Sequence, residues 1–188
     1  KKRETDTSDG TCTLRQYLLE IRRHSLKTLA RFRIGRADGR LTERAMEKGF
    51  TEAELVQSGL ASAETGRDYW RRNLLLFPHL EVGMVSHFSQ KCPDDSDLKY
   101  QAKNEFRSST CLFYNQDAAH EAEEVALVEG QHDLLSVVGK GQYETVLATI
   151  GGPTRKQLDF LKGLPGLKRL VLAFDNDQAG RKHANKVR

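Results

Sequence analysis

From Glu124 to Arg188, short apolar runs alternate with stretches of helical periodicity, and this alternation constrains the fold more than any other feature. The runs VALV, TVLATI and LVLAF contain few polar residues, as expected for strands that are buried on both faces of a parallel sheet. Strand and helix alternate three times, which predicts a parallel sheet with right-handed crossover connections. We therefore expect an α/β unit over residues 124–188.

The residues before this unit indicate a mixed α+β subdomain over residues 13–123. Residues 1–12 are polar without periodicity and predict a flexible lead-in. Helices are expected at Leu14–Leu29, at Thr42–Lys48 and after Thr51, where Glu54 completes a capping-box pattern. The stretch NLLLFPHLEVGMVSHFS predicts a strand, a turn and a strand, and residues 116–124 form either a helix or a linker.

Acidic residues follow two of the predicted parallel strands. Glu129 comes directly after VALV, and Asp175 and Asp177 come directly after LVLAF. If these strands are neighbours, the three carboxylates meet at one edge of the sheet, where α/β folds place their ligands. Clustered carboxylates repel one another, a divalent cation relieves the repulsion, and hard oxygen ligands favour Mg²⁺ or Mn²⁺. The alternative is that these acids cap helices, as Asp177 before AGRKHA could do.

Composition narrows the class of protein. The chain has 188 residues with a formal net charge of +4, which favours a polyanionic partner. Apolar residues make up 38%, and no run approaches the roughly 18 apolar residues that span a bilayer. The three cysteines lie far apart without finger-like spacing, so we expect reduced thiols in a cytoplasmic protein and no zinc in this chain.

The stretches VALVEGQHD and LVLAFDNDQAGRKHA resemble the two signature stretches of the Toprim domain, in the form found in DnaG-like DNA primases and in phage or mitochondrial primase-helicases. The resemblance implies that Glu129 is a metal-site residue and possible general acid or base. It implies that Asp175 and Asp177 are metal ligands and that Asp133 fills a further acidic position. The ATIGG stretch ending at Gly152 resembles the glycine turn after the second Toprim strand, which either approaches a phosphate or is a plain turn.

Upstream, ARFRIG, KGFTEAELVQSGL and NLLLFP resemble successive stretches of the amino-terminal subdomain of the DnaG polymerase core. Lys91 falls where that family has an arginine after a glycine-rich strand, although SHFSQK lacks those glycines. For each basic residue, the alternative to phosphate binding is an ordinary surface charge that faces solvent. The resemblance implies that nucleotide or template phosphates are bound by Lys99, Lys91, Arg31, Arg71, Arg72 and Arg181.

These features predict the catalytic core of a DNA primase that synthesises short RNA primers on single-stranded DNA from nucleoside triphosphates. Its setting would be a bacterial, phage or plasmid replication system, with a replicative helicase as partner in cis or in trans. The alternatives are a strand-cleaving Toprim nuclease or topoisomerase and a non-catalytic nucleic-acid-binding module. The resemblance implies that the Toprim unit continues into another strand with acidic residues, so we expect either that the unit ending at Arg188 is truncated or that its metal site is incomplete.

Overall fold

The computed structural model describes residues 13–70, 74–91 and 110–188, which form two compact units. Unit 1 comprises residues 1–22, 32–78 and 87–107, and unit 2 comprises residues 23–31, 79–86 and 108–188, so far as they are described. The division into subdomains over residues 13–123 and 124–188 stays a prediction.

A three-stranded parallel sheet forms the centre of unit 2, with β4 between β5 and β6. The register pairs Ala126 of β4 with Val146 on one side and with Val171 on the other. The strands and the helices that follow them are β4 (Glu124–Val128), α5 (Gln131–Gly139), β5 (Val146–Ala148), α6 (Arg155–Lys162), β6 (Arg169–Leu172) and α7 (Gln178–Val187). The predicted alternation and the predicted neighbourhood of the first and third strands are confirmed.

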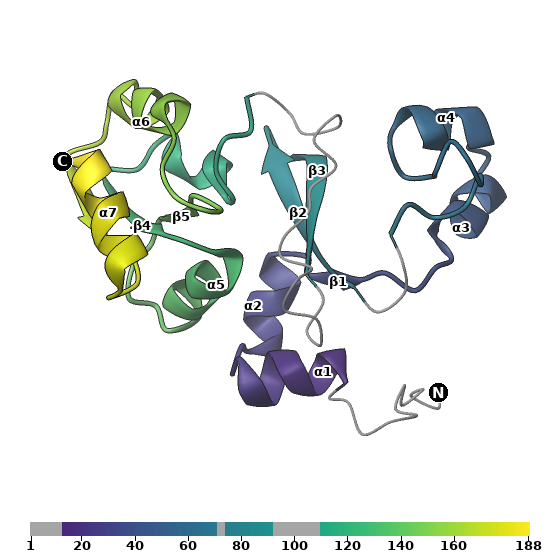
Figure 1. Ribbon diagram of the computed structural model, residues 1–188, viewed down its shortest axis with the longest axis horizontal. Helices are drawn as coiled ribbons and strands as arrows, with labels where there is room; N and C mark the ends of the chain where they lie inside the picture. The colour runs from purple at the N-terminus through teal and green to yellow at the C-terminus, as the bar shows by residue number, and fades with distance from the viewer. Residues whose placement is uncertain (1–12, 71–73, 92–109) are drawn as a thin grey trace. The chain divides into compact units, whose positions relative to one another are not determined.

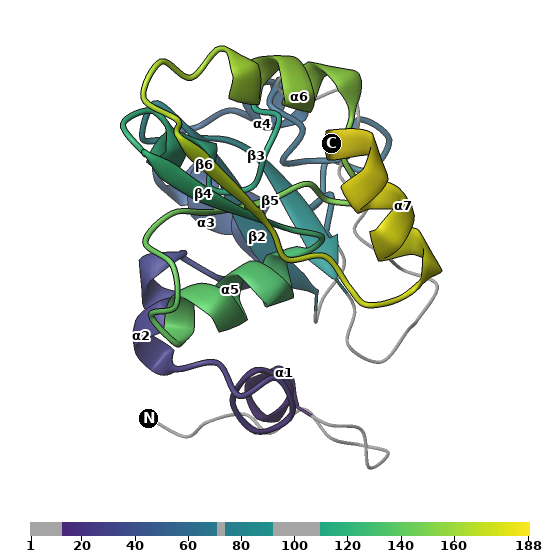
Figure 2. The same cartoon turned by 90° about the vertical axis from the view of Figure 1, so that its left-hand side faces the viewer.

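Helices α5 and α6 cover opposite faces of this sheet (Figure 2). The face under α6 carries a core in which Leu161 packs with Leu127, Leu147 and Phe113. Strands β4 and β5 are buried apart from Glu124, whereas β6 is half-buried and its Arg169 is exposed. The expectation that all three strands are buried on both faces is therefore wrong for β6. Both β5 and β6 have one partner strand in the described sheet, but β5 is also covered by Tyr114, which forms a bridge to Ala148.

A second sheet has the strand order β1-β2-β3. Its strands β2 and β3 and the turn between them are the predicted strand, turn and strand. The turn residues Val82 and Gly83 both have positive φ, and their N–H groups donate to the two carboxylate oxygens of Asp117 at 3.0 and 2.8 Å. The two units share this hairpin, since residues 79–86 belong to unit 2. The strands are β1 (Gly35–Arg36), β2 (Leu75–Glu81) and β3 (Met84–Lys91).

Helices α3 (Leu41–Glu47) and α4 (Glu52–Gln57) lie where the sequence predicts them (Figure 1). Thr51 forms the expected capping box with Glu54. The single helix expected over Leu14–Leu29 is wrong. A break at Arg23, whose φ is +56°, separates its first part from α2 (Leu26–Arg31). That first part consists of α1 (Leu14–Gln16) and the π-helical turn η1 (Tyr17–Ile21).

Residues 116–124 are neither a full helix nor a plain linker, because they begin with the 3₁₀ turn η3 (Gln116–Ala119) and run into β4. No helix among the described residues is both long and apolar enough to cross a membrane.

Candidate functional site

Glu129 and Asp175 lie at the carboxyl edge of the unit 2 sheet because their strands, β4 and β6, are direct neighbours. The backbone N–H of Asp175 points to Oε1 of Glu129 at an N···O distance of 3.4 Å. About a fifth of the Glu129 side chain is exposed, and Asp175 is exposed. The edge thus holds one half-buried and one solvent-facing carboxylate, which is a geometry that a ligand from solution can reach.

Asp177 closes the loop that starts at Asp175. It is the N-cap of α7, and its Oδ1 accepts a hydrogen bond from the N–H of Gly180 at 2.7 Å. Gly180 is buried at this point, and a side chain there would overlap the carbonyl oxygen of Asp175. Asp177 thus caps α7, as the alternative reading expected, and the same hydrogen bond holds the Asp175–Asp177 loop against α7. A part for Asp177 in binding a metal stays a prediction.

His183 is a neighbour of Glu129 that sequence reasoning missed. Its Nδ1 lies 3.3 Å from Oε1 of Glu129, a close contact whose geometry falls short of a hydrogen bond, and its side chain is 16% exposed. The ring stands edge-on to Phe174, with the ring centroids 5.9 Å apart. Its position on α7, after the acidic loop, is the sequence signal that could have suggested it.

The glycine turn after β5 accommodates the same histidine. Gly151 and Gly152 have φ of +94° and +101°, a backbone conformation that favours glycine. A side chain at Gly152 would overlap the imidazole of His183. Of the two roles considered for ATIGG, this contact supports the structural one, because the space beside Gly152 is filled by His183.

Asp133 serves the backbone of α5. It is the third residue of that helix, and its Oδ2 accepts a hydrogen bond from the N–H of Gly130 at 3.0 Å. This bond holds the turn that directly follows Glu129 and so fixes where the chain leaves β4. A direct part for Asp133 in binding a ligand stays a prediction.

The basic residues are only partly described. Arg181 is exposed on α7, and its Nη1 donates to Oδ1 of Asn176 at 3.3 Å, beside the acidic loop. Lys91 is half-buried at the end of β3, with its Nζ 5.9 Å from the ring centroid of Tyr17, and Arg31 is exposed at the end of α2. Lys99, Arg71 and Arg72 lie outside the described residues. The phosphate-binding roles of all six stay predictions.

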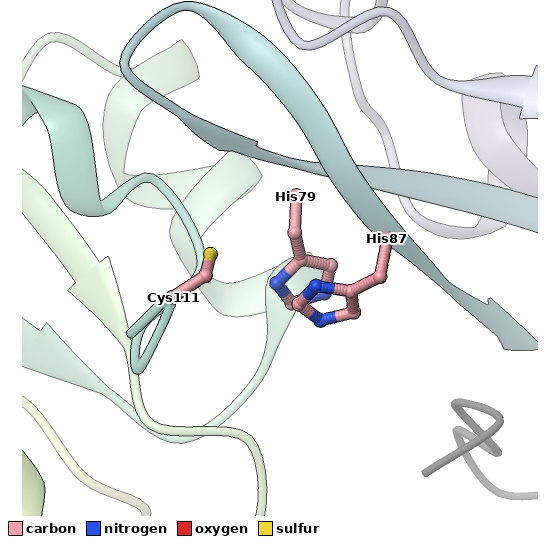
Figure 3. A group of neighbouring side chains, drawn as sticks. All are labelled: His79, His87 and Cys111. Carbon is pink, nitrogen blue, oxygen red and sulfur yellow. The ribbon is translucent and has the colours of Figure 1, made fainter. Parts of the chain in front are cut away.

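The described residues contain one tight group of potential metal ligands, and none of its members is a residue of the acidic edge. His79, His87 and Cys111 are all buried, and their ligand atoms lie within 4.8 Å of one another (Figure 3). Sequence reasoning treated Cys111 as an isolated thiol, since both histidines lie more than twenty residues before it in the chain.

Comparison with known proteins connects this architecture to a family. Residues 126–188 match a family described as Toprim-like. A DNA primase of Clostridium acetobutylicum is 31% identical over 183 residues, which cover 92% of this chain and 30% of that protein. The chain is a relative of the DnaG-type DNA primases. A DNA primase of Synechocystis is also similar, with 29% identity over 144 residues that cover 71% of this chain and 23% of that protein.

The fold agrees with this relationship. The RNA polymerase domain of the Mycobacterium tuberculosis primase DnaG, solved with a double-stranded DNA that has a 6-nucleotide overhang, is 27% identical with a TM-score of 0.77. The match covers 95% of this chain and 61% of that one. The expected fold class and the resemblance to DnaG-like primases are thus confirmed. The chain spans less than a third of the length of either curated primase.

Proposed function

We propose that this chain is part of the catalytic core of a DNA primase, which makes short RNA primers on single-stranded DNA from nucleoside triphosphates. The observation that carries the proposal is the placement of Glu129 beside Asp175 at the carboxyl edge of a Toprim-like sheet. The relationship to DNA primases over 92% of the chain supports this reaction over the other reactions of Toprim folds.

The residues at this edge fit a divalent cation. Glu129, Asp175 and Asp177 offer only carboxylate oxygens, the hard ligands that suit Mg²⁺ or Mn²⁺ better than softer metals. A bound ion of this kind neutralises phosphate charge and lowers the cost of nucleophilic attack at phosphorus. Glu129 is oriented by the N–H of Asp175, and Asp177 keeps its loop in place through Gly180.

We assign the substrate phosphates to the basic residues. A lysine acts there as a point charge, whereas an arginine offers two parallel hydrogen bonds to one phosphate. Contacts of this kind position the strands and carry little sequence information. Arg181 is the described candidate beside the acidic loop, and the others are Arg31, Lys91, Lys99, Arg71 and Arg72.

The further parts of the proposal concern the chain's setting. We propose an amino-terminal subdomain over residues 13–123 followed by a Toprim subdomain over residues 124–188, acting in the cytoplasm. A replicative helicase, encoded in the same chain or separately, would deliver the single-stranded template.

A labelled-nucleotide assay on single-stranded template, with Mg²⁺ or Mn²⁺, tests the reaction class. Short RNA products that require both the template and the metal are the expected result. Cleavage of the template without synthesis would replace the proposal with a strand-cleaving Toprim enzyme. Template binding without either reaction would replace it with a nucleic-acid-binding module.

A further inference from the structure

The group formed by His79, His87 and Cys111 has no part in the proposed reaction. His79 lies on β2 and His87 on β3, the two strands of one hairpin, and Cys111 lies beside that hairpin, with its Sγ 3.6 Å from the carbonyl oxygen of Leu80. The two imidazoles and the thiol therefore come from three separate stretches of sequence and gather on one side of the hairpin (Figure 3).

The side chains of this group suit a metal ion of intermediate softness. Two imidazole nitrogens and one sulfur form a donor set found in zinc sites, where the sulfur binds as a thiolate. Oxygen-loving ions such as Mg²⁺ prefer carboxylates and water, so this group and the acidic edge call for different metals.

The spacing of the group is compatible with shared coordination. In tetrahedral zinc sites the Zn–N distance is about 2.0–2.1 Å and the Zn–S distance about 2.3 Å, so neighbouring ligand atoms lie roughly 3.3–3.6 Å apart. The three ligand atoms already lie within 4.8 Å of one another. Side-chain rotations that move each atom by less than about 1 Å would complete the geometry.

Burial strengthens the case for a metal. His79, His87 and Cys111 are 3%, 7% and 1% exposed, and such complete burial is less common for histidine than for apolar residues or cysteine. The ring of His79 is further held edge-on by Tyr114, at a centroid distance of 5.1 Å, so its orientation is fixed by packing. A group held in this way loses little freedom when it binds an ion.

We propose that His79, His87 and Cys111 bind one Zn²⁺ ion, with water or a further group as the fourth ligand, and that this ion fastens the residues around Cys111 to the β2–β3 hairpin. On binding, the Cys111 thiol releases its proton to solvent and becomes a thiolate. The proposal departs from the expectation of no zinc in this chain, which considered only the spacing of the cysteines.

Zinc content measured by mass spectrometry on the purified, dialysed chain tests the proposal. We expect about one zinc ion per chain in the wild type and a loss of at least about tenfold in Cys111→Ser and in His87→Gln. His120→Gln, which removes an exposed imidazole outside the group, should keep the ion. Wild-type protein without stoichiometric zinc, or equal zinc in Cys111→Ser, would overturn the proposal.

Substitution with Co²⁺ separates ligation from folding. A thiolate bound to Co²⁺ gives a near-ultraviolet charge-transfer band, so the wild type should show this band. Cys111→His should bind Co²⁺ through three imidazoles but lack the band, and its metal binding shows that the variant is folded. A charge-transfer band that persists in Cys111→His would assign the sulfur to another cysteine and overturn the site. These readouts do not require primer synthesis, so they succeed or fail independently of the proposed function.

Discussion

At the residue scale, the contact between His183 and Glu129 determines how one carboxylate of the edge is held. His183 lies against the Glu129 carboxylate, the Phe174 ring and Gly152, and it is nearly buried. In the proposed function Glu129 binds the metal, and a group that touches a metal ligand without binding the metal orients that ligand. We therefore regard His183 as a positioning residue for Glu129.

Replacing this residue tests that role. His183→Ala is expected to lower Mn²⁺ affinity or primer synthesis by roughly 10–100-fold, because Glu129 loses the side chain that limits its motion. Mn²⁺ titration followed by electron paramagnetic resonance measures the affinity. Lys182→Ala, at the exposed neighbouring position, is the matched control, and His183→Asn should recover part of the loss. Unchanged Mn²⁺ affinity and synthesis in His183→Ala would show that the contact is incidental.

The acidic edge could be predicted from sequence and its supporting contacts could not. The position of Glu129 and Asp175 after two apolar runs is enough to place them at one edge once the strands are parallel neighbours. The contact with His183 depends on the path of α7 back across the sheet, and the group around Cys111 depends on a hairpin that folds beside a distant segment. The first leaves only the position of His183 after the acidic loop as a signal in the sequence, and the second leaves no local pattern.

At the scale of elements, α3 depends on a carboxylate from far along the chain. Asp68 accepts hydrogen bonds from the N–H groups of Leu41 and Thr42 at 2.8 and 2.7 Å and from the Thr42 hydroxyl at 2.6 Å. Burial raises the pKa of Asp68, but the hydrogen bonds from Thr42 and Leu41 and the charge of Arg44 outweigh it, so the net pKa is lowered. Asp68 thus caps the start of α3 in its ionised form.

The lowered pKa makes the stability of unit 1 depend on pH. A folded-state pKa below the unfolded one adds stability that is present above the ordinary carboxyl pKa of about 4 and is lost as the pH falls through the folded value. Asp68→Asn should lower the free energy of unfolding near neutral pH by about 1 kcal/mol and weaken its decline in acid. Urea unfolding at neutral and acidic pH measures both, with Glu64→Gln as an exposed control. Parallel acid profiles for wild type and Asp68→Asn would contradict this role.

The amino end of α6 is joined to the sheet by one amide side chain. Gln157 is buried, its Oε1 accepts from the N–H of Thr154 at 2.8 Å, and its Nε2 donates to the carbonyl oxygens of Leu112 and Thr149 at 2.8 and 3.0 Å. Sequence predicted helix α6 but not this link, because the carbonyl partners of Gln157 lie 45 and 8 residues before it in the chain, outside the helix.

Gln157→Leu should lower the free energy of unfolding by about 1–3 kcal/mol, since it leaves one buried and one partly buried carbonyl group without this donor. Thermal and urea unfolding measure the change. Lys156→Leu, which places the same side chain at the neighbouring exposed position, should stay within about 0.5 kcal/mol of the wild type. A loss in Lys156→Leu as large as that in Gln157→Leu would point to a general defect of the helix.

At the scale of the whole molecule, the two units carry different parts of the proposed reaction. Unit 2 holds the acidic edge with Arg181, and Lys91 belongs to unit 1. The sequence predicted a mixed first part and a parallel-sheet second part. The contacts instead group residues 23–31, which include α2, and residues 79–86 of the β2–β3 hairpin with the parallel sheet in unit 2. Such a division depends on packing between distant segments, which local patterns do not contain.

The central claim is that the edge formed by Glu129 and Asp175 is where nucleotides are joined. Template-dependent RNA synthesis by Asp175→Asn, compared with Asp159→Asn on the exposed face of α6, tests it most directly. Both changes remove one carboxylate from unit 2, so a difference between them reflects position and not net charge. We predict a loss of roughly 100-fold or more in Asp175→Asn and near wild-type synthesis in Asp159→Asn. Undiminished synthesis in a folded Asp175→Asn variant would contradict the account.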